Sequence, residues 1–143
     1  MKFDIYPYIG VGNIKLGMTP DEIKKIVGEK KSSFKRNEED YFETDEFDSN
    51  GTNFFVSYGK DGKVDSIEFA LPSEIYILNE NLYGKSFEKI RKLLKKMDSE
   101  LEDDGYSITS YKFGIGVYCP EADENEDACP ESIIVFKENY YDV

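Results

Sequence analysis

The chain has 143 residues, of which 30 are acidic and 18 are basic, so its formal net charge is −12. Hydrophobic residues make up 39% and aromatic residues 15%, which is enough apolar mass for one folded domain and excludes a disordered tail. The negative charge repels phosphate backbones and anionic lipid head groups, whereas it attracts a basic protein. We therefore expect a single domain, residues 1–143, that binds protein and neither nucleic acid nor a membrane.

The first ten residues contain one Lys and no apolar run of signal-peptide length. No later stretch approaches the about 20 apolar residues of a membrane-spanning helix. Two cysteines, Cys119 and Cys129, agree with a reducing compartment, in which thiols stay unbridged. We expect a cytoplasmic protein whose first element is a strand over residues 3–11.

A short amphipathic helix is predicted between Thr19 and Gly28. Thr19-Pro20-Asp21-Glu22 has the spacing of a capping box, in which the Thr side chain accepts a hydrogen bond from the third helical amide. Proline is well tolerated at the first helical position because its missing N–H is not needed there. Apolar residues at Ile23, Ile26 and Val27 give the helix one buried face.

Three strands are predicted after this helix, over residues 40–47, 53–58 and 64–71, because these runs are rich in aromatic and β-branched side chains. Lys60-Asp61-Gly62-Lys63 stands between the last two runs. An Asp-Gly pair adopts the positive φ angles that match strand twist, so this segment is the strongest hairpin signal in the chain.

The pattern returns 67 residues later, where Thr19 is matched by Ser86 and Ile23 by Ile90. The second helix is expected to continue toward Leu101, preceded by a strand over 74–78 and followed by strands over 106–113, 114–119 and 132–137. A chance match is the alternative. The pattern predicts an α+β fold of two degenerate helix-plus-antiparallel-strand repeats, about 1–72 and 73–143, which form one continuous antiparallel sheet with the helices on one face.

Motifs for catalysis or cofactor binding are weak. The chain has no His, which removes the commonest general base and the usual zinc ligand. The segment Gly10-Val11-Gly12 begins like a dinucleotide-binding motif, but Lys15 stands at the place of its third glycine. Cys119 and Cys129 each open a Cys-Pro-Glu triplet, as two ordinary thiols or as a disulfide or redox pair. We expect no enzyme activity, no cofactor and no metal centre.

Acidic residues are concentrated in the loop 121–127, which has five carboxylates in seven residues. A calcium loop of the EF-hand type is excluded, because Ala128 stands where glycine is needed and Ile134 where a Glu is needed. A solvated hairpin tip, a weak calcium site and a binding surface for a basic partner remain as alternatives. The second candidate segment combines acids with aromatic rings. The candidate partner-binding residues are Glu39, Asp40, Tyr41, Phe42, Glu43, Glu121, Asp123, Glu124, Glu126 and Asp127.

The run from Asn13 to Ile23, closed by Gly28, resembles the helix-opening segment of tandem-repeat domains of the beta-lactamase-inhibitor-protein and small outer-membrane-assembly lipoprotein type. The resemblance implies helices packed on an antiparallel sheet whose concave face grips a protein target. In its size, acidity and unpaired cysteines the chain also resembles the immunity proteins of bacterial contact-dependent and polymorphic toxin systems.

That second resemblance implies a protein-binding inhibitor that neutralises a cognate, basic, nuclease-type toxin domain by tight stoichiometric binding. Three other hypotheses stay open at this point: an enzyme that uses paired carboxylates, a calcium-responsive binding module, and a non-catalytic scaffold or oligomer-forming protein.

Overall fold

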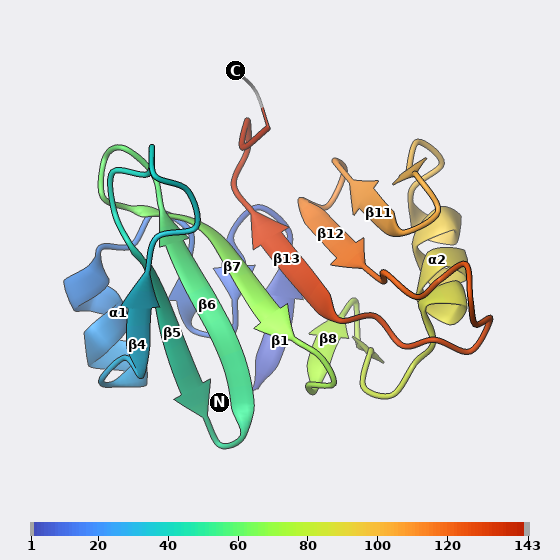
Figure 1. Ribbon diagram of the computed structural model, residues 1–143, viewed down its shortest axis with the longest axis horizontal. Coiled ribbons are helices and arrows are strands. Elements are labelled where there is room, and N and C mark those ends of the chain that lie inside the picture. The colour runs from blue at the N-terminus through green and yellow to red at the C-terminus, as the bar shows by residue number, and fades with distance from the viewer. Residues whose placement is uncertain (1, 142–143) are drawn as a thin grey trace.

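The computed structural model describes residues 2–141 as an α+β fold of two sheets and two helices (Figure 1). The large sheet has eight strands, each antiparallel to its neighbours, in the order β10-β11-β12-β13-β7-β6-β5-β4. In that order the strands are Glu102–Asp103, Ser107–Ser110, Ile115–Tyr118, Ser132–Phe136, Val64–Ala70, Thr52–Tyr58, Thr44–Ser49 and Ser32–Phe34.

The small sheet has five short strands in the order β3-β2-β1-β8-β9. Strands β1 and β8 run parallel, with Phe3 opposite Ile75, and the other pairs are antiparallel. The small sheet lies behind the large sheet in Figure 1, with the helices α1 and α2 toward opposite sides. Its strands are Ile14–Lys15, Gly10–Val11, Phe3–Tyr6, Ile75–Ile77 and Glu80–Asn81.

The expectation of one continuous antiparallel sheet is therefore wrong. The leading strands β1 and β8 pair with each other and not with the edges of the large sheet. Phe3 and Ile5 of β1 and Ile75 and Ile77 of β8 are all buried, so the two strands form a second apolar layer over the core face of the large sheet. Burial of these apolar side chains between the two sheets stabilises the second layer.

The boundaries of several predicted strands also change. Residues 3–11 form the hairpin of β1 and β2, because the chain turns at 7–9, where Tyr8 has a φ of 62°. The strand predicted over 40–47 begins only at Thr44, and the aromatic residues before it lie in an exposed loop. The hairpin at 60–63 is confirmed, with Gly62 at a φ of 76° between β6 and β7.

Helix α1, Pro20–Val27, has the predicted capping box: the Thr19 side chain accepts from the Glu22 amide at 3.3 Å, and the Glu22 carboxylate accepts from the Thr19 amide at 3.2 Å. Helix α2, Phe87–Met97, is capped by the Ser86 side chain alone, which accepts from the Lys89 amide at 3.2 Å, and it ends short of Leu101. Neither helix within residues 2–141 has the length and apolar character needed to cross a membrane.

The core lies between the two sheets and the buried faces of both helices. Large-sheet side chains such as Phe54 and Phe69 alternate with outward residues such as Phe55 and Glu68, as the two-residue period of a strand requires. The Phe54 and Phe69 rings stack at 5.3 Å between centroids, and Ile23 of α1 and Ile90 of α2 belong to the same cluster. This packing fixes which loops meet at each end of the large sheet.

Replacement of Phe54 by Ala should lower the free energy of unfolding by about 3–5 kcal/mol, because the ring is fully buried in the centre of this cluster. Phe55→Ala, on the opposite and partly exposed face, is the matched control and should cost less than half as much. Urea denaturation measures both values. Equal losses would contradict the assignment of the core to the Phe54 face.

Candidate functional site

The strand register defines two ends of the large sheet. At the tail end, uppermost in Figure 1, lie the loop 35–43, the turns 59–63 and 111–114 and the tail 137–141. At the opposite end lie the turn 50–51, the crossover 71–74 and the loop 119–131. Each end carries a hollow large enough to hold a side chain or small ligand.

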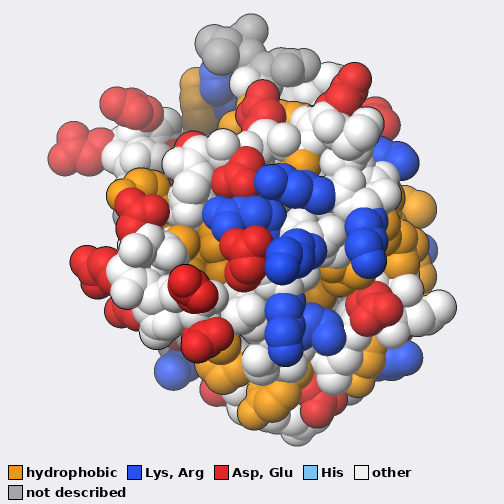
Figure 2. All heavy atoms as spheres, turned by 90° about the vertical axis from the view of Figure 1, so that its right-hand side faces the viewer, with side chains coloured by type: hydrophobic (Ala, Val, Ile, Leu, Met, Phe, Trp, Pro, Cys, Tyr) orange, Lys and Arg blue, Asp and Glu red, His pale blue; other side chains and the backbone are white. Residues whose placement is uncertain are grey.

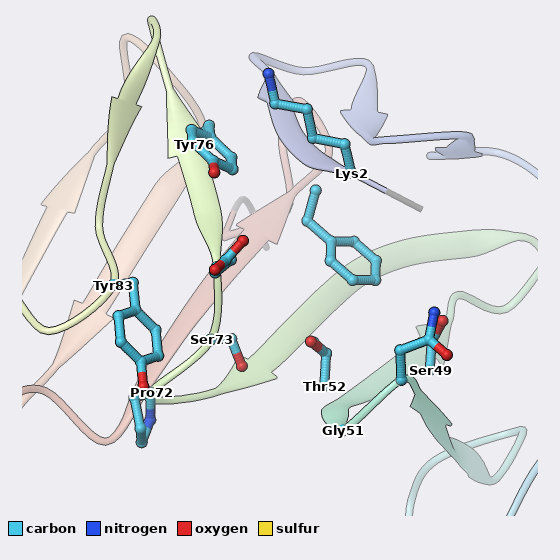
Figure 3. A pocket seen from close by; sticks show the side chains of 11 residues that line it. Lys2, Ser49, Gly51, Thr52, Pro72, Ser73, Tyr76 and Tyr83 are labelled. Atoms are coloured by element: carbon cyan, nitrogen blue, oxygen red, sulfur yellow. The ribbon is translucent and has the colours of Figure 1, made fainter.

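The hollow at the opposite end has a volume of about 610 Å³ and lies between the β5–β6 turn and the strand β8. Figure 3 shows Tyr76 beside Lys2 on one side of it, with Ser49, Gly51 and Thr52 on the other. Its charged lining residues are Lys2 and Glu74, and the Lys2 ammonium lies 4.7 Å from the centroid of the Tyr76 ring. The lining residues include one carboxylate, that of Glu74, and no thiol.

The hollow at the tail end has a volume of about 540 Å³ and brings together three separate segments of the chain. Glu39, Asp40 and Tyr41 come from the loop before β5, and Asp65 comes from β7. The remaining lining residues are Tyr58, Gly59, Lys60, Asp61, Lys137, Asn139 and Tyr140. Half of the sequence-predicted partner-binding residues, Glu39–Glu43, therefore lie at or beside a real hollow.

The β6–β7 turn holds the predicted aromatic residues in place. The Gly59 amide donates to the Lys63 carbonyl at 2.9 Å, and the Asp61 carboxylate accepts from the Lys63 amide at 3.0 Å. The Phe42 ring lies against Gly62, close enough that an added Cβ would touch the ring at 3.4 Å. Tyr41 is 67% exposed, with the Lys60 ammonium 5.5 Å from its ring centroid. The loop 39–43 thus presents its rings outward from an ordered turn.

A cluster of aromatic rings continues this surface along the tail. Phe136, at the end of β13, is buried beneath Tyr140 and Tyr141, with centroid distances of 5.6 and 5.1 Å. Tyr111 packs against Phe136 from the neighbouring turn, and the Tyr8 hydroxyl donates to the Tyr111 carbonyl. Tyr111 and Tyr141 remain 46% and 51% exposed. We use the name tail-end surface for Glu39, Asp40, Tyr41, Phe42, Glu43, Lys60, Asp61, Asp65, Tyr111, Lys137, Tyr140 and Tyr141.

Two acidic groups at this end are perturbed by burial. Burial raises the pKa of the Asp65 carboxyl, and the nearby Asp61 carboxylate adds to the effect, while the Lys137 ammonium opposes it. One Asp65 oxygen, Oδ1, is buried without a hydrogen-bond partner. Burial likewise raises the pKa of the Tyr58 hydroxyl, which donates to Asp45 at 2.8 Å. The floor of the hollow therefore carries a carboxylate that water solvates incompletely.

The structure does not bring the two predicted acidic segments together. The loop 121–127 leaves β12 at the opposite end of the sheet from the loop 39–43, with β13, β7 and β6 between the two sides. It packs beside α2, where the Phe87 amide donates to the Ala128 carbonyl at 2.8 Å and the Tyr106 hydroxyl donates to Asp123 at 2.5 Å. Glu121, Asp123, Glu124, Glu126 and Asp127 are all exposed on it.

The two cysteines flank this loop as free thiols. Cys119 is buried, Cys129 is exposed, and the Cys119 sulfur lies 3.6 Å from the Cys129 carbonyl oxygen. Burial raises the pKa of the Cys119 thiol, which disfavours a reactive thiolate. Within residues 2–141 no group of three or more Asp, Glu or Cys side chains converges as metal ligands would.

Several residues of the tail-end surface could not be found by local sequence reasoning. Asp65, Lys137 and Tyr140 join Tyr41 only through the pairing of β7 with β13 and β6. The adjacent rings of Tyr140 and Tyr141, after the predicted strand 132–137, are the local signal in the sequence for this part of the surface. Compared with protein-family models, curated protein sequences and solved structures, the chain matches none.

Asp65→Asn should change how stability depends on pH. Because the folded-state pKa of Asp65 lies above its ordinary value of 3.8, the folded protein binds more protons than the unfolded chain between these two values, and stability is lost as pH rises through that window. The free energy of unfolding of D65N relative to the unaltered protein should therefore increase as the pH rises above about 3.8 and level off above the folded-state pKa of Asp65.

Urea denaturation at a series of pH values measures this difference. Asp61→Asn, a change of the same chemistry at an exposed neighbour, is the control and should show a smaller rise. A difference between D65N and the unaltered protein that stays constant with pH would mean that Asp65 ionises in the folded state as freely as in water.

Proposed function

We propose that the chain is a non-catalytic, protein-binding inhibitor: a cytoplasmic immunity protein that neutralises a cognate bacterial toxin domain by stoichiometric binding. The tail-end surface supports the proposal, because the exposed Tyr41 and four carboxylates line one hollow and the exposed Tyr111 and Tyr141 belong to the aromatic cluster of the tail. The toxin domain is proposed to be basic and nuclease-like, because acidic groups complement a surface that binds phosphate backbones.

The composition of this surface is that of a protein-binding hot spot. Tyrosine is enriched at such sites because a large rigid ring buries much area and its hydroxyl can still find a hydrogen-bond partner. Tyr41, Tyr111 and Tyr141 are each close to half exposed or more, although the chain has a well-filled core elsewhere. Apolar area left on the surface in one place, bordered by charges, is characteristic of a contact with another protein.

The carboxylates of the surface would orient a basic partner and increase its rate of association. Glu39, Asp40 and Asp61 border the hollow, and Asp65 forms part of its floor. A Lys or Arg side chain entering from a partner would satisfy the unpartnered Asp65 oxygen. The overall charge of −12 would accelerate the approach of a basic partner and make the rate of association fall as salt is added.

We further propose that the two halves of the chain, about 1–72 and 73–143, are degenerate copies of one unit. Strands β7 and β13 are neighbours at the centre of the large sheet, with three strands on each side. Each follows a capped helix, and Thr19 and Ser86 cap these helices at positions 67 residues apart. This arrangement supports the duplication, and the loops in which the copies differ include the loop 39–43.

The most direct functional test uses the protein domain encoded immediately upstream of this chain. Cells that express the C-terminal domain of that neighbour should lose viability, and co-expression of this chain should restore it. The purified pair should form a one-to-one complex whose association slows with salt. Failure to bind and failure to protect would together remove the immunity hypothesis.

Tyr41→Ala should weaken that complex by roughly 10- to 100-fold, the effect of truncating a central aromatic anchor. The folded state should be unaffected, because the ring is 67% exposed. Tyr83→Ala is the matched control: Tyr83 is 56% exposed but lines the groove at the opposite end of the sheet. Calorimetric titration measures both affinities, and equal effects of the two variants would place the contact elsewhere.

A further inference from the structure

Helix α2 carries a concentration of positive charge that the overall acidity conceals. Six of the 18 basic residues lie within residues 85–96, which contain one acid, Glu88. Figure 2 faces this side of the molecule and shows Lys and Arg side chains gathered over the helix, with Asp and Glu side chains beside them. The patch runs against the net charge of −12 and therefore requires an explanation.

Four of these cations form a stripe over α2. Lys89, Lys92 and Lys96 share one helical face, opposite the buried side chains, and Lys85 directly precedes the N-cap Ser86. None of the four forms an ion pair with another described residue. The basic stripe consists of Lys85, Lys89, Lys92 and Lys96.

A ridge of charged side chains that already have ion-pair partners within the chain runs beside the stripe. Arg91 contacts Glu88 at 2.5 Å and Asp103 at 2.7 Å, and the Lys95 ammonium lies 3.6 Å from Asp103. The Arg91 guanidinium also donates to the carbonyl of Gly105 at 3.3 Å. These groups have found partners within the chain, so the stripe remains as the unpaired part of the helix.

The acidic loop 121–127 lies on the far side of this ridge. A groove lined by Phe87, Arg91, Ala122 and Glu126 separates the loop from the helix. Among the described residues the five loop carboxylates have no Lys or Arg partner within 4.0 Å. Tyr106, 44% exposed, is tied to the loop through its hydroxyl bond to Asp123.

We propose that this face binds a second copy of the same chain, with the basic stripe of each protomer against the acidic loop 121–127 of the other. Two patches of opposite charge that lie side by side on one face become complementary when a copy is turned by a two-fold rotation, which gives a closed dimer. Tyr106, which is exposed beside the acidic loop, supplies an aromatic anchor. The inference is independent of the proposed function, which uses the tail-end surface.

Charge complementarity favours a second copy as the occupant of this face. The loop is held in shape by backbone hydrogen bonds, including Ala122 N–H to the Cys119 carbonyl at 3.2 Å and Asn125 N–H to the Glu121 carbonyl at 3.2 Å. A loop already ordered loses little entropy on contact. A different acidic protein would also be repelled by the net charge of −12. It would in addition leave the acidic loop 121–127 without a basic counterpart.

Sedimentation velocity over a protein concentration series tests the dimer, at about 0.05 M and about 0.5 M salt. The unaltered chain should dimerise, and added salt should weaken the dimer at least tenfold, because its contacts are exposed ion pairs. Charge reversal of the stripe (K89E, K92E and K96E together) or of the loop (E124K, E126K and D127K together) should each leave a monomer.

A mixture of the two charge-reversed variants is the decisive arm. In the mixed dimer both contacts again join opposite charges, so dimerisation should return to the level of the unaltered chain. This recovery would also show that each variant is folded. A control with the same change in net charge, K15E, K25E and K35E together, alters exposed lysines elsewhere and should still dimerise. A chain that stays monomeric at low salt, or variants that fail to rescue each other, would overturn the proposal.

Discussion

The apolar contact between the two sheets is the constraint on which the other features depend. The ring of Phe3, on β1, packs edge-on against Phe54 and Phe69 of the large sheet at centroid distances of 5.7 and 5.0 Å. This contact fixes the N-terminal hairpin over the core and carries the following turn to the tail end of the sheet. There the Tyr8 ring packs against Phe136 at 6.2 Å and supports the aromatic residues of the tail. The tail-end surface is therefore built on rigid elements, as a site that orders few groups on binding should be.

Charge is distributed so that two faces of one acidic molecule favour different partners. The tail-end surface combines tyrosines with carboxylates and complements a basic protein, whereas the basic stripe on α2 complements an acidic one. The strand order places the loop 39–43 and the loop 121–127 on different sides and at different ends of the large sheet. Under the two proposals, a toxin domain and a second copy occupy separate surfaces and can bind at the same time. The net charge of the chain predicts only the contact with a basic protein.

The local elements could be predicted from the sequence because their signals are local. The Thr19 capping box and the Asp61-Gly62 hairpin need only neighbouring residues, and both form as expected. The parallel pairing of β1 with β8 could not be predicted, since it joins segments about 70 residues apart and no short pattern specifies it. The same reasoning applies to the site. Tyr41 and its neighbours were visible as an acidic, aromatic run, but a run of this kind also has strand propensity, and only the register shows that Asp65 and Tyr140 lie beside it.

Hydrogen–deuterium exchange of the chain, alone and in complex with the domain encoded upstream, tests the central claim that the tail-end surface binds the partner. Formation of the complex should slow exchange in residues 38–43, 59–61 and 137–141, while exchange of the backbone around the groove at 49–52 and 72–74 should not change. Protection confined to that groove, or to α2 and the loop 121–127, would contradict the claim and move the partner to another face.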